Sequence, residues 1–200
     1  MQAHAVPAAH AEHPPAAHMS SRVEPATLGM LLFIASEIML FGAFFTAYFF
    51  VRVVNGSPWP EEPFHLPVFV AGVNTAILVT SSFTMHWAQQ SIARGNRAGL
   101  QAGLTLTLAL GLVFLLTQVR EYSRVGFAPS DGAFGTIFYG LTGLHGAHVF
   151  VGLTLLTFAT VRAFRGHFTP EHHHGVEIPG IYWHFVDVMW IVVYTTIYIL

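Results

Sequence analysis

The sequence has no cysteine, no lysine and few charged residues of any kind. Without cysteine the chain cannot form a disulfide, a thiolate metal site or an iron–sulfur cluster. Charged residues make up 9% of the chain, whereas ordinary globular proteins carry about 25%. The formal net charge of −2 provides no basic field to attract nucleic acid. Together with a mean hydropathy of +0.56, the low charge indicates a membrane protein.

What the chain does have is long apolar runs. A transmembrane helix needs about 20 mostly apolar residues to cross a hydrocarbon layer of about 30 Å. Five segments meet this requirement, and polar loops rich in turn-forming residues connect them. They are residues 27–51, 67–87, 98–119, 134–161 and 179–200. The sequence therefore predicts an all-α fold, a polytopic membrane bundle of five transmembrane helices.

The first 26 residues differ from the rest. They are rich in alanine, proline and histidine and show no helical period, so we expect a mobile tail, residues 1–26, ahead of a membrane domain, residues 27–200. The tail has no apolar core of the kind found in a secretory signal. Its irregularly spaced histidines, which give no fixed metal geometry, are His4, His10, His13 and His18.

The arginines predict an orientation. The tail and the second and fourth loops carry five, against three in the other loops, and this favours an N-terminus in the cytoplasm and a C-terminus outside. Four on the expected inner side are also candidates for pairing with lipid phosphates, although a role in setting topology is the simpler interpretation. These four are Arg94, Arg97, Arg162 and Arg165.

Small residues are expected to bring the helices together, because leucine burial gives no driving force in lipid. Gly99 and Gly103 form a GxxxG pair, and Ala43 and Ala47 form a similar small pair. Three glycines in residues 140–146 follow one another at three-residue spacing. We interpret all of them as packing surfaces.

Ionisable residues inside the predicted spans are few, and each is costly in lipid. Glu37 lies near mid-bilayer depth and should face protein, either protonated or paired with a donor from another helix. His145 and His148 are three residues apart, so both should look toward one side of their helix. His184 and Asp187 share a helix face in the same way, and a neutral imidazole can donate a ring hydrogen to the carboxylate.

These buried groups allow three interpretations. A structural, hydrogen-bonded polar cluster is favoured, because the groups can satisfy one another. A proton or ion pathway is the second. A metal site built from the histidines and Glu37 is the third, but the helices do not repeat the Glu-x-x-His pattern of di-metal bundles. We therefore predict no metal in this chain.

Several ordered stretches resemble subunit III of the haem–copper respiratory oxidases. They are "SEIMLFGAFFTAYF" in the first span, "FGTIFYG" and "TGLHGAHVFVGL" in the fourth, "FTPEHHHGVE" in the last loop and "YWHFVDVMWIVVYTTIYIL" at the end. The resemblance runs from about residue 28 to residue 200. It is to the five-helix bacterial form, which lacks the first two of the seven helices of larger members.

The resemblance implies a subunit without a redox centre. In that family haem and copper belong to subunits I and II, and subunit III packs beside subunit I, holds phospholipid in a V-shaped cleft and supports sustained turnover and proton uptake. Glu37 matches the family's buried, carbodiimide-reactive glutamate. His145, His148, His184 and Asp187 align with its polar residues in the later helices. A bacterial plasma membrane would be the location.

The resemblance favours a cytochrome c oxidase over a quinol oxidase, because "FTPEHHHGVE" and "YWHFVDVMW" look closer to that branch. A small independent transporter is an alternative, in which the polar residues would line a pathway. A membrane metalloenzyme using His145 and His148 is a further one.

Overall fold

The computed structural model describes residues 24–56 and 66–200, and this part of the chain is built from five long helices. Each is long and apolar enough to cross a membrane, which confirms the predicted all-α membrane bundle. The helices are α1 (Pro25–Asn55), α2 (Val68–Ala93), α3 (Arg97–Tyr122), α4 (Gly132–Phe164) and α5 (His174–Tyr194). A short π-helical turn, η2 (Thr195–Ile199), continues α5.

Most predicted span boundaries fall within four residues of the observed ones, but two differ more. The second span was expected to end at residue 87, whereas α2 continues to Ala93. We expected the last span to begin at Pro179, but α5 begins at His174 and runs through this proline. Proline removes one backbone hydrogen bond, a loss that is best tolerated near the start of a helix. The first span also begins earlier than expected, because α1 starts at Pro25. The histidines of the tail lie outside the described residues.

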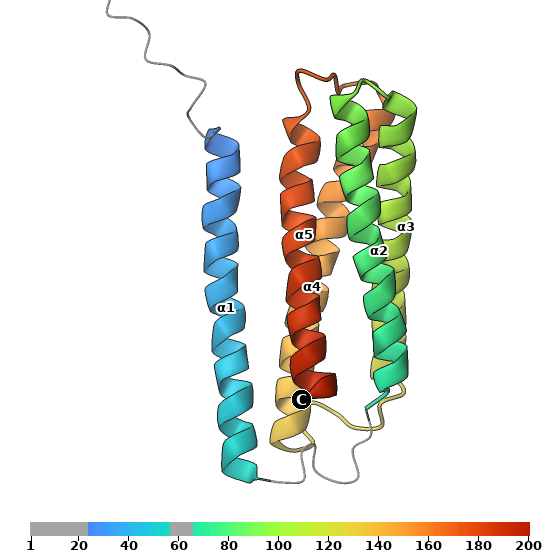
Figure 1. Ribbon diagram of the computed structural model, residues 1–200. Helices are drawn as coiled ribbons and strands as arrows, with labels where there is room; N and C mark the ends of the chain where they lie inside the picture. The colour runs from blue at the N-terminus through green and yellow to red at the C-terminus, as the bar shows by residue number, and fades with distance from the viewer. Residues whose placement is uncertain (1–23, 57–65) are drawn as a thin grey trace, which may run out of the picture.

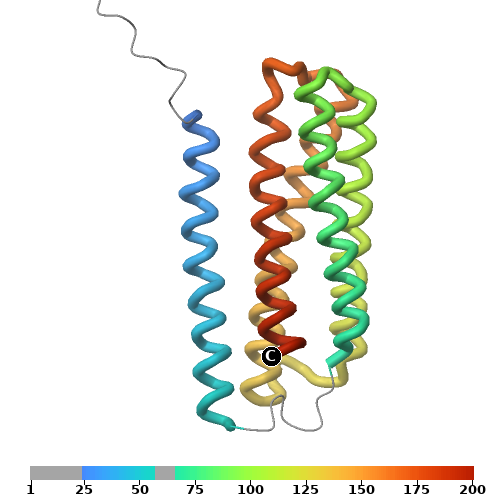
Figure 2. The backbone as a smooth tube through the Cα atoms, viewed as in Figure 1, coloured from blue at the N-terminus to red at the C-terminus, as the bar shows by residue number. Residues whose placement is uncertain are grey.

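Helices α2 to α5 form an antiparallel bundle, and α1 stands to one side of it (Figure 1). Helix α1 packs against α4 and α5. In its most apolar stretch only 6% of the residues are buried, whereas 56% are buried in the span formed by α5 and η2. Figure 2 shows the same division of the chain into a bundle and a flanking helix.

The closest packing in the bundle joins α2 and α3 and depends on glycine. A methyl group placed on Gly103 would lie 2.7 Å from Cβ of Ala88 and 3.0 Å from its Cα. One placed on Gly99 would lie 2.5 Å from the hydroxyl of Ser91. Such distances are too short for a real side chain, so the GxxxG pair is confirmed as a packing surface.

The other small-residue patterns are only partly confirmed. Ala43 and Ala47 are exposed on α1 and form no packing surface within the described chain. On α4, Gly140 lies against Phe44 of α1, but neither Gly143 nor Gly146 has a neighbouring atom among the described residues that a methyl group would meet within 4 Å. Small residues mark where helices can approach, but not whether a neighbour is present.

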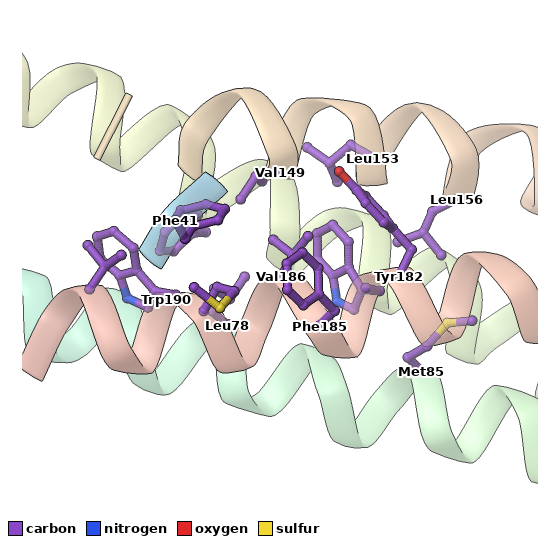
Figure 3. Packing of buried hydrophobic residues seen from close by; sticks show 14 of the residues in the cluster. Phe41, Leu78, Met85, Val149, Leu153, Leu156, Tyr182, Phe185, Val186 and Trp190 are labelled. Carbon is purple, nitrogen blue, oxygen red and sulfur yellow. The ribbon is translucent and has the colours of Figure 1, made fainter. Parts of the chain in front are cut away.

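The apolar core follows α5 along its length (Figure 3). Leu78 and Met85 of α2 approach α5 from one side, and Leu153 and Leu156 of α4 from the other. Trp183 is fully buried in this core. Its indole N–H donates a hydrogen bond of 2.9 Å to the hydroxyl of Ser81 in α2. Helix α5 is thus the central element against which the others pack.

Both ends of α1 are tied to the rest of the chain by polar contacts. Just before α1, the carboxylate of Glu24 lies 2.9 Å from the imidazole Nδ1 of His174, at the start of α5. In the last turn of α1, the guanidinium of Arg52 donates a hydrogen bond of 2.5 Å to the backbone carbonyl of Leu200. Polar contacts therefore supplement the sparse apolar packing of this helix.

Candidate functional site

Glu37 and His148 join α1 to α4 in the middle of the helices. Oε2 of Glu37 lies 2.9 Å from Nε2 of His148, and both side chains are largely buried, with exposed fractions of 15% and 11%. Tyr182 of α5 donates a hydrogen bond of 3.2 Å to the backbone carbonyl of His148. The Phe41 ring centroid lies 5.0 Å from that of His148. Three helices thus meet around one carboxyl–imidazole pair.

The second nitrogen of His148 fixes where the protons lie. Nδ1 is 2.8 Å from the backbone carbonyl of Leu144, which can only accept, so Nδ1 carries a hydrogen. In the neutral imidazole Nε2 is then an acceptor, and Glu37 must be protonated to donate to it. If Nε2 is protonated instead, Glu37 is a carboxylate. In both states one proton lies between Glu37 and His148, and the pair as a whole is neutral.

His184 and Asp187 do not bond to each other directly as we expected. The hydroxyl of Ser82, from α2, donates to Oδ2 of Asp187 and lies 3.0 Å from Nδ1 of His184. Because the Ser82 hydroxyl donates its hydrogen to Asp187, it can only accept from His184, so Nδ1 of His184 is the donor in the hydrogen bond between them. Oδ1 of Asp187 is buried without a hydrogen-bond partner among the described residues. The predicted pair is therefore a three-residue bridge between α2 and α5.

His145 belongs to neither of these groups. It is fully buried, with its ring centroid 5.7 Å from that of Phe114 and 4.9 Å from that of Trp190. The expectation that His145 and His148 serve one side of α4 is wrong, because His148 faces α1 and His145 faces α3 and α5. The predicted single polar cluster is therefore three separate polar positions.

The described residues offer no support for the metal alternative. Across residues 24–56 and 66–200, no three His, Cys, Asp or Glu side chains converge in a way that could hold a metal ion. What the arrangement can do is hold a proton between α1 and α4, and link α2 to α5 through Ser82.

The four lipid-headgroup candidates lie at one end of the molecule, where α1 begins (Figure 1). Arg94 and Arg97 flank the turn between α2 and α3, and Arg162 and Arg165 lie at the end of α4. All four are exposed. The guanidinium of Arg162 lies 5.2 Å from the ring centroid of Phe168.

Sequence reasoning missed the hydroxyl groups that hold the helices together. Ser82 bridges His184 and Asp187, Ser81 accepts from Trp183, and the indole N–H of Trp190 donates to Thr75 over 2.9 Å. Serine and threonine in apolar helices usually bond to a carbonyl of their own helix, so they give little signal in a sequence.

Comparison with known proteins identifies the family. A family model described as "Cytochrome c oxidase subunit III" matches residues 12–200. The chain is 41% identical over 177 residues to "Cytochrome c oxidase subunit 3" of Oryctolagus cuniculus. The matched region covers 85% of this chain and 67% of that protein. It is also 41% identical over 174 residues to the protein of the same name from Thermostichus vulcanus, covering 86% of each chain.

The chain belongs to the cytochrome c oxidase subunit III family. This confirms the resemblance found in the sequence. As a subunit III it is an integral, multi-pass membrane subunit of cytochrome c oxidase and forms a complex with other subunits of the enzyme. Membership also implies that the haem and copper centres of the oxidase lie in those other subunits.

The Ser82 bridge in this subunit III can be tested by mutation. Replacing Ser82 by alanine leaves Oδ2 of Asp187 without its donor, and an unpaired buried polar group costs about 1–3 kcal/mol, more if it is charged. We expect a lower temperature for release of this subunit from the purified oxidase, measured by gel analysis after stepwise heating. Thr80→Ala, the control, removes an exposed hydroxyl that bonds only within α2. Equal release temperatures for the two variants would contradict the bridge.

Proposed function

We propose that this chain is the non-redox subunit of a proton-pumping cytochrome c oxidase, that it stabilises the catalytic subunit, binds membrane phospholipid and supports proton uptake during turnover. The observation that carries the proposal is the 2.9 Å contact between Oε2 of Glu37 and Nε2 of His148, where the bundle meets a helix that packs only sparsely against it. A neutral pair inside a membrane that holds one proton between two basic sites is suited to proton transfer.

The packing of α1 supports the stabilising and lipid-binding roles. Large apolar side chains are exposed on this helix, including Leu32, Met39 and Val53. Such a surface suits contact with lipid chains and with subunits I and II of the oxidase. Arg94, Arg97, Arg162 and Arg165 are suited to pair with phosphate groups at the boundary of the membrane.

The same arginines support an orientation. With the N-terminus in the cytoplasm, all four lie on the cytoplasmic side of a bacterial plasma membrane, together with Arg22 of the tail, as the positive-inside rule favours. Arg52, Arg120 and Arg124 then lie outside. Cytochrome c, rather than a quinol, is the proposed electron donor of the complex, and an activity assay of the purified oxidase with each donor tests this choice.

The proton role is tested with two variants of Glu37 in the assembled oxidase. Glu37→Ala removes both the proton and the link to His148. Glu37→Gln keeps a hydrogen bond to Nε2 of His148 but cannot pass a proton. If the carboxyl supports proton uptake, both variants should lose activity over successive turnovers faster than the unmodified enzyme, and both should show a lower proton-to-electron ratio.

If the link is only structural, Glu37→Gln should behave like the unmodified enzyme and Glu37→Ala alone should decay. A hydrogen bond involving a charged group is worth about 1.5–3 kcal/mol, so loss of the link should raise the population of undocked α1 by roughly tenfold or more. Glu171→Gln, in the exposed loop before α5, is the matched control. Unchanged decay and proton ratio in both Glu37 variants would reject the proton role.

A further inference from the structure

The core of the bundle contains polar atoms that no described protein group satisfies. Both ring nitrogens of His145 are buried and have no hydrogen-bond partner among the described residues, and the same is true of Nε2 of Gln118 in α3. His145 is 0% exposed and Gln118 4% exposed. Buried polar groups in native proteins are nearly always paired, with protein or with ordered water.

The register of α3 against α4 places these two side chains at the same level. The Tyr122 hydroxyl donates a hydrogen bond of 2.9 Å to the Thr142 hydroxyl, which joins the two antiparallel helices. Gln118 lies one helical turn before Tyr122 on α3, and His145 lies about one turn after Thr142 on α4, so both lie one turn further into the core. The next turn of α3 brings Phe114, whose ring centroid lies 5.7 Å from that of His145. His145 therefore lies between Phe114 and Tyr122 along α3, at the level of Gln118.

The neighbouring side chains cannot satisfy the imidazole. A neutral imidazole has one N–H donor and one acceptor nitrogen. The ring of Phe114 is nearly perpendicular to the imidazole and can receive an N–H, but an aromatic face cannot donate to the acceptor nitrogen. The indole N–H of Trp190 donates to the hydroxyl of Thr75. The hydroxyl of Thr142 donates to the backbone carbonyl of Phe138. The acceptor nitrogen of His145 needs a donor that is not a side chain in contact with it.

Gln118 extends the polar region toward the end of the bundle. Its side chain lies near the hydroxyls of Tyr122 on α3 and Tyr198 in η2, so two elements contribute polar groups to this region. A buried water typically makes about three hydrogen bonds, to groups that would otherwise be unpaired. The amide N–H of Gln118 can donate to such a water, and the unprotonated ring nitrogen of His145 can accept one of its hydrogens.

We propose that an ordered water molecule is bound in the core of the bundle between His145 and Gln118. It donates one hydrogen to the acceptor nitrogen of His145 and accepts a hydrogen from Nε2 of Gln118. The imidazole is then neutral, and the water links α3 to α4 one turn inside the contact between Tyr122 and Thr142. This site is separate from the Glu37–His148 pair and does not depend on the function proposed for it.

The first test is the density of the assembled oxidase, determined by electron cryomicroscopy at a resolution where buried waters are visible elsewhere in the complex. We expect a peak within hydrogen-bonding distance of both a ring nitrogen of His145 and Nε2 of Gln118. A dry contact overturns the proposal, and so does a Gln118 amide bonded directly to the imidazole. This measurement uses the unmodified protein, so it does not depend on whether a variant folds.

The second test is a double-mutant cycle with His145→Leu and Gln118→Leu, measured as the shift in the temperature at which the subunit leaves the oxidase. If one water serves both residues, either single variant releases it, so the double variant should shift less than the sum of the two. Additive shifts would overturn the proposal. In the control cycle, Gln118→Leu is combined with Thr160→Val, whose hydroxyl bonds only to Leu156 of its own helix, and these shifts should add.

Discussion

Replacing Trp183 by alanine is expected to be the most damaging single change in this subunit, with a loss of about 3–5 kcal/mol of folding free energy. The indole is fully buried at the centre of α5. It fills the space left by two glycines, since a methyl group on Gly111 would lie 2.6 Å from Cη2 of the ring and one on Gly152 2.8 Å from Cε3. Alanine would leave a cavity between α3, α4 and α5 and would remove the hydrogen bond to Ser81.

The expected result is an oxidase that is purified with little or none of this subunit, measured as the ratio of subunit III to haem. Trp183→Phe separates the contribution of packing from that of the hydrogen bond, because it keeps most of the ring volume but lacks the N–H group that bonds to Ser81. The ratio of subunit III to haem should fall less than in Trp183→Ala. Trp87→Ala, at a position that is 47% exposed, is the matched control and should leave the ratio unchanged. A normal ratio for Trp183→Ala would contradict the central packing role of this residue.

Replacing Gly103 by valine should have the second largest effect. A methyl group at this position already lies 3.0 Å from the Cα of Ala88 and 3.1 Å from its backbone nitrogen. Backbone atoms cannot rotate away as a side chain can, so α2 and α3 would have to separate. Overpacking of a core usually costs about 1–3 kcal/mol, and occasionally more. We expect the larger values here, because the GxxxG contact brings the backbones of these two helices together.

Gly143→Val on α4 is the control, because it introduces the same β-branched residue into a transmembrane helix. Within residues 24–56 and 66–200, no atom lies within 4 Å of a methyl group placed there, apart from its own helix and chain neighbours. The measurement is the amount of the subunit that remains in membranes and in the purified oxidase. If the two variants are depleted equally, the contact between α2 and α3 is not what makes Gly103 necessary.

The fold was largely predictable because its main determinant is local. Each membrane-spanning helix corresponds to a run of apolar residues, which can be identified without knowing which other helices pack against it. The start of α5 was missed because a proline normally marks a boundary, and "HGVE" ahead of it carries the polar character of a loop. Helix ends in the interfacial region are decided by the loops and by contacts such as that of His174 with Glu24, which a sequence does not display.

The sequence singled out buried polar residues but not the partners that the structure gives them. Depth alone singled out Glu37, and the structure gives it a partner in His148. Helical spacing, however, describes which residues share a face of one helix and not which neighbour each meets. Positions three apart on a helix differ by about 60° in direction, and α4 lies where α1 and the bundle meet. This difference is enough to send His148 toward α1 and His145 into the core.

The polar contacts of α1 determine the height of this helix relative to the rest of the bundle. Its apolar surface would be equally well solvated by lipid at several heights, so packing alone sets no depth. Glu24, Glu37 and Arg52 each meet a fixed partner, and at 1.5 Å per residue the outer two are about 42 Å apart, near the full thickness of a bilayer with its headgroups. A slide of one helical turn would break all three contacts together. The height of α1 relative to the bundle is thus fixed near both of its ends and near its middle.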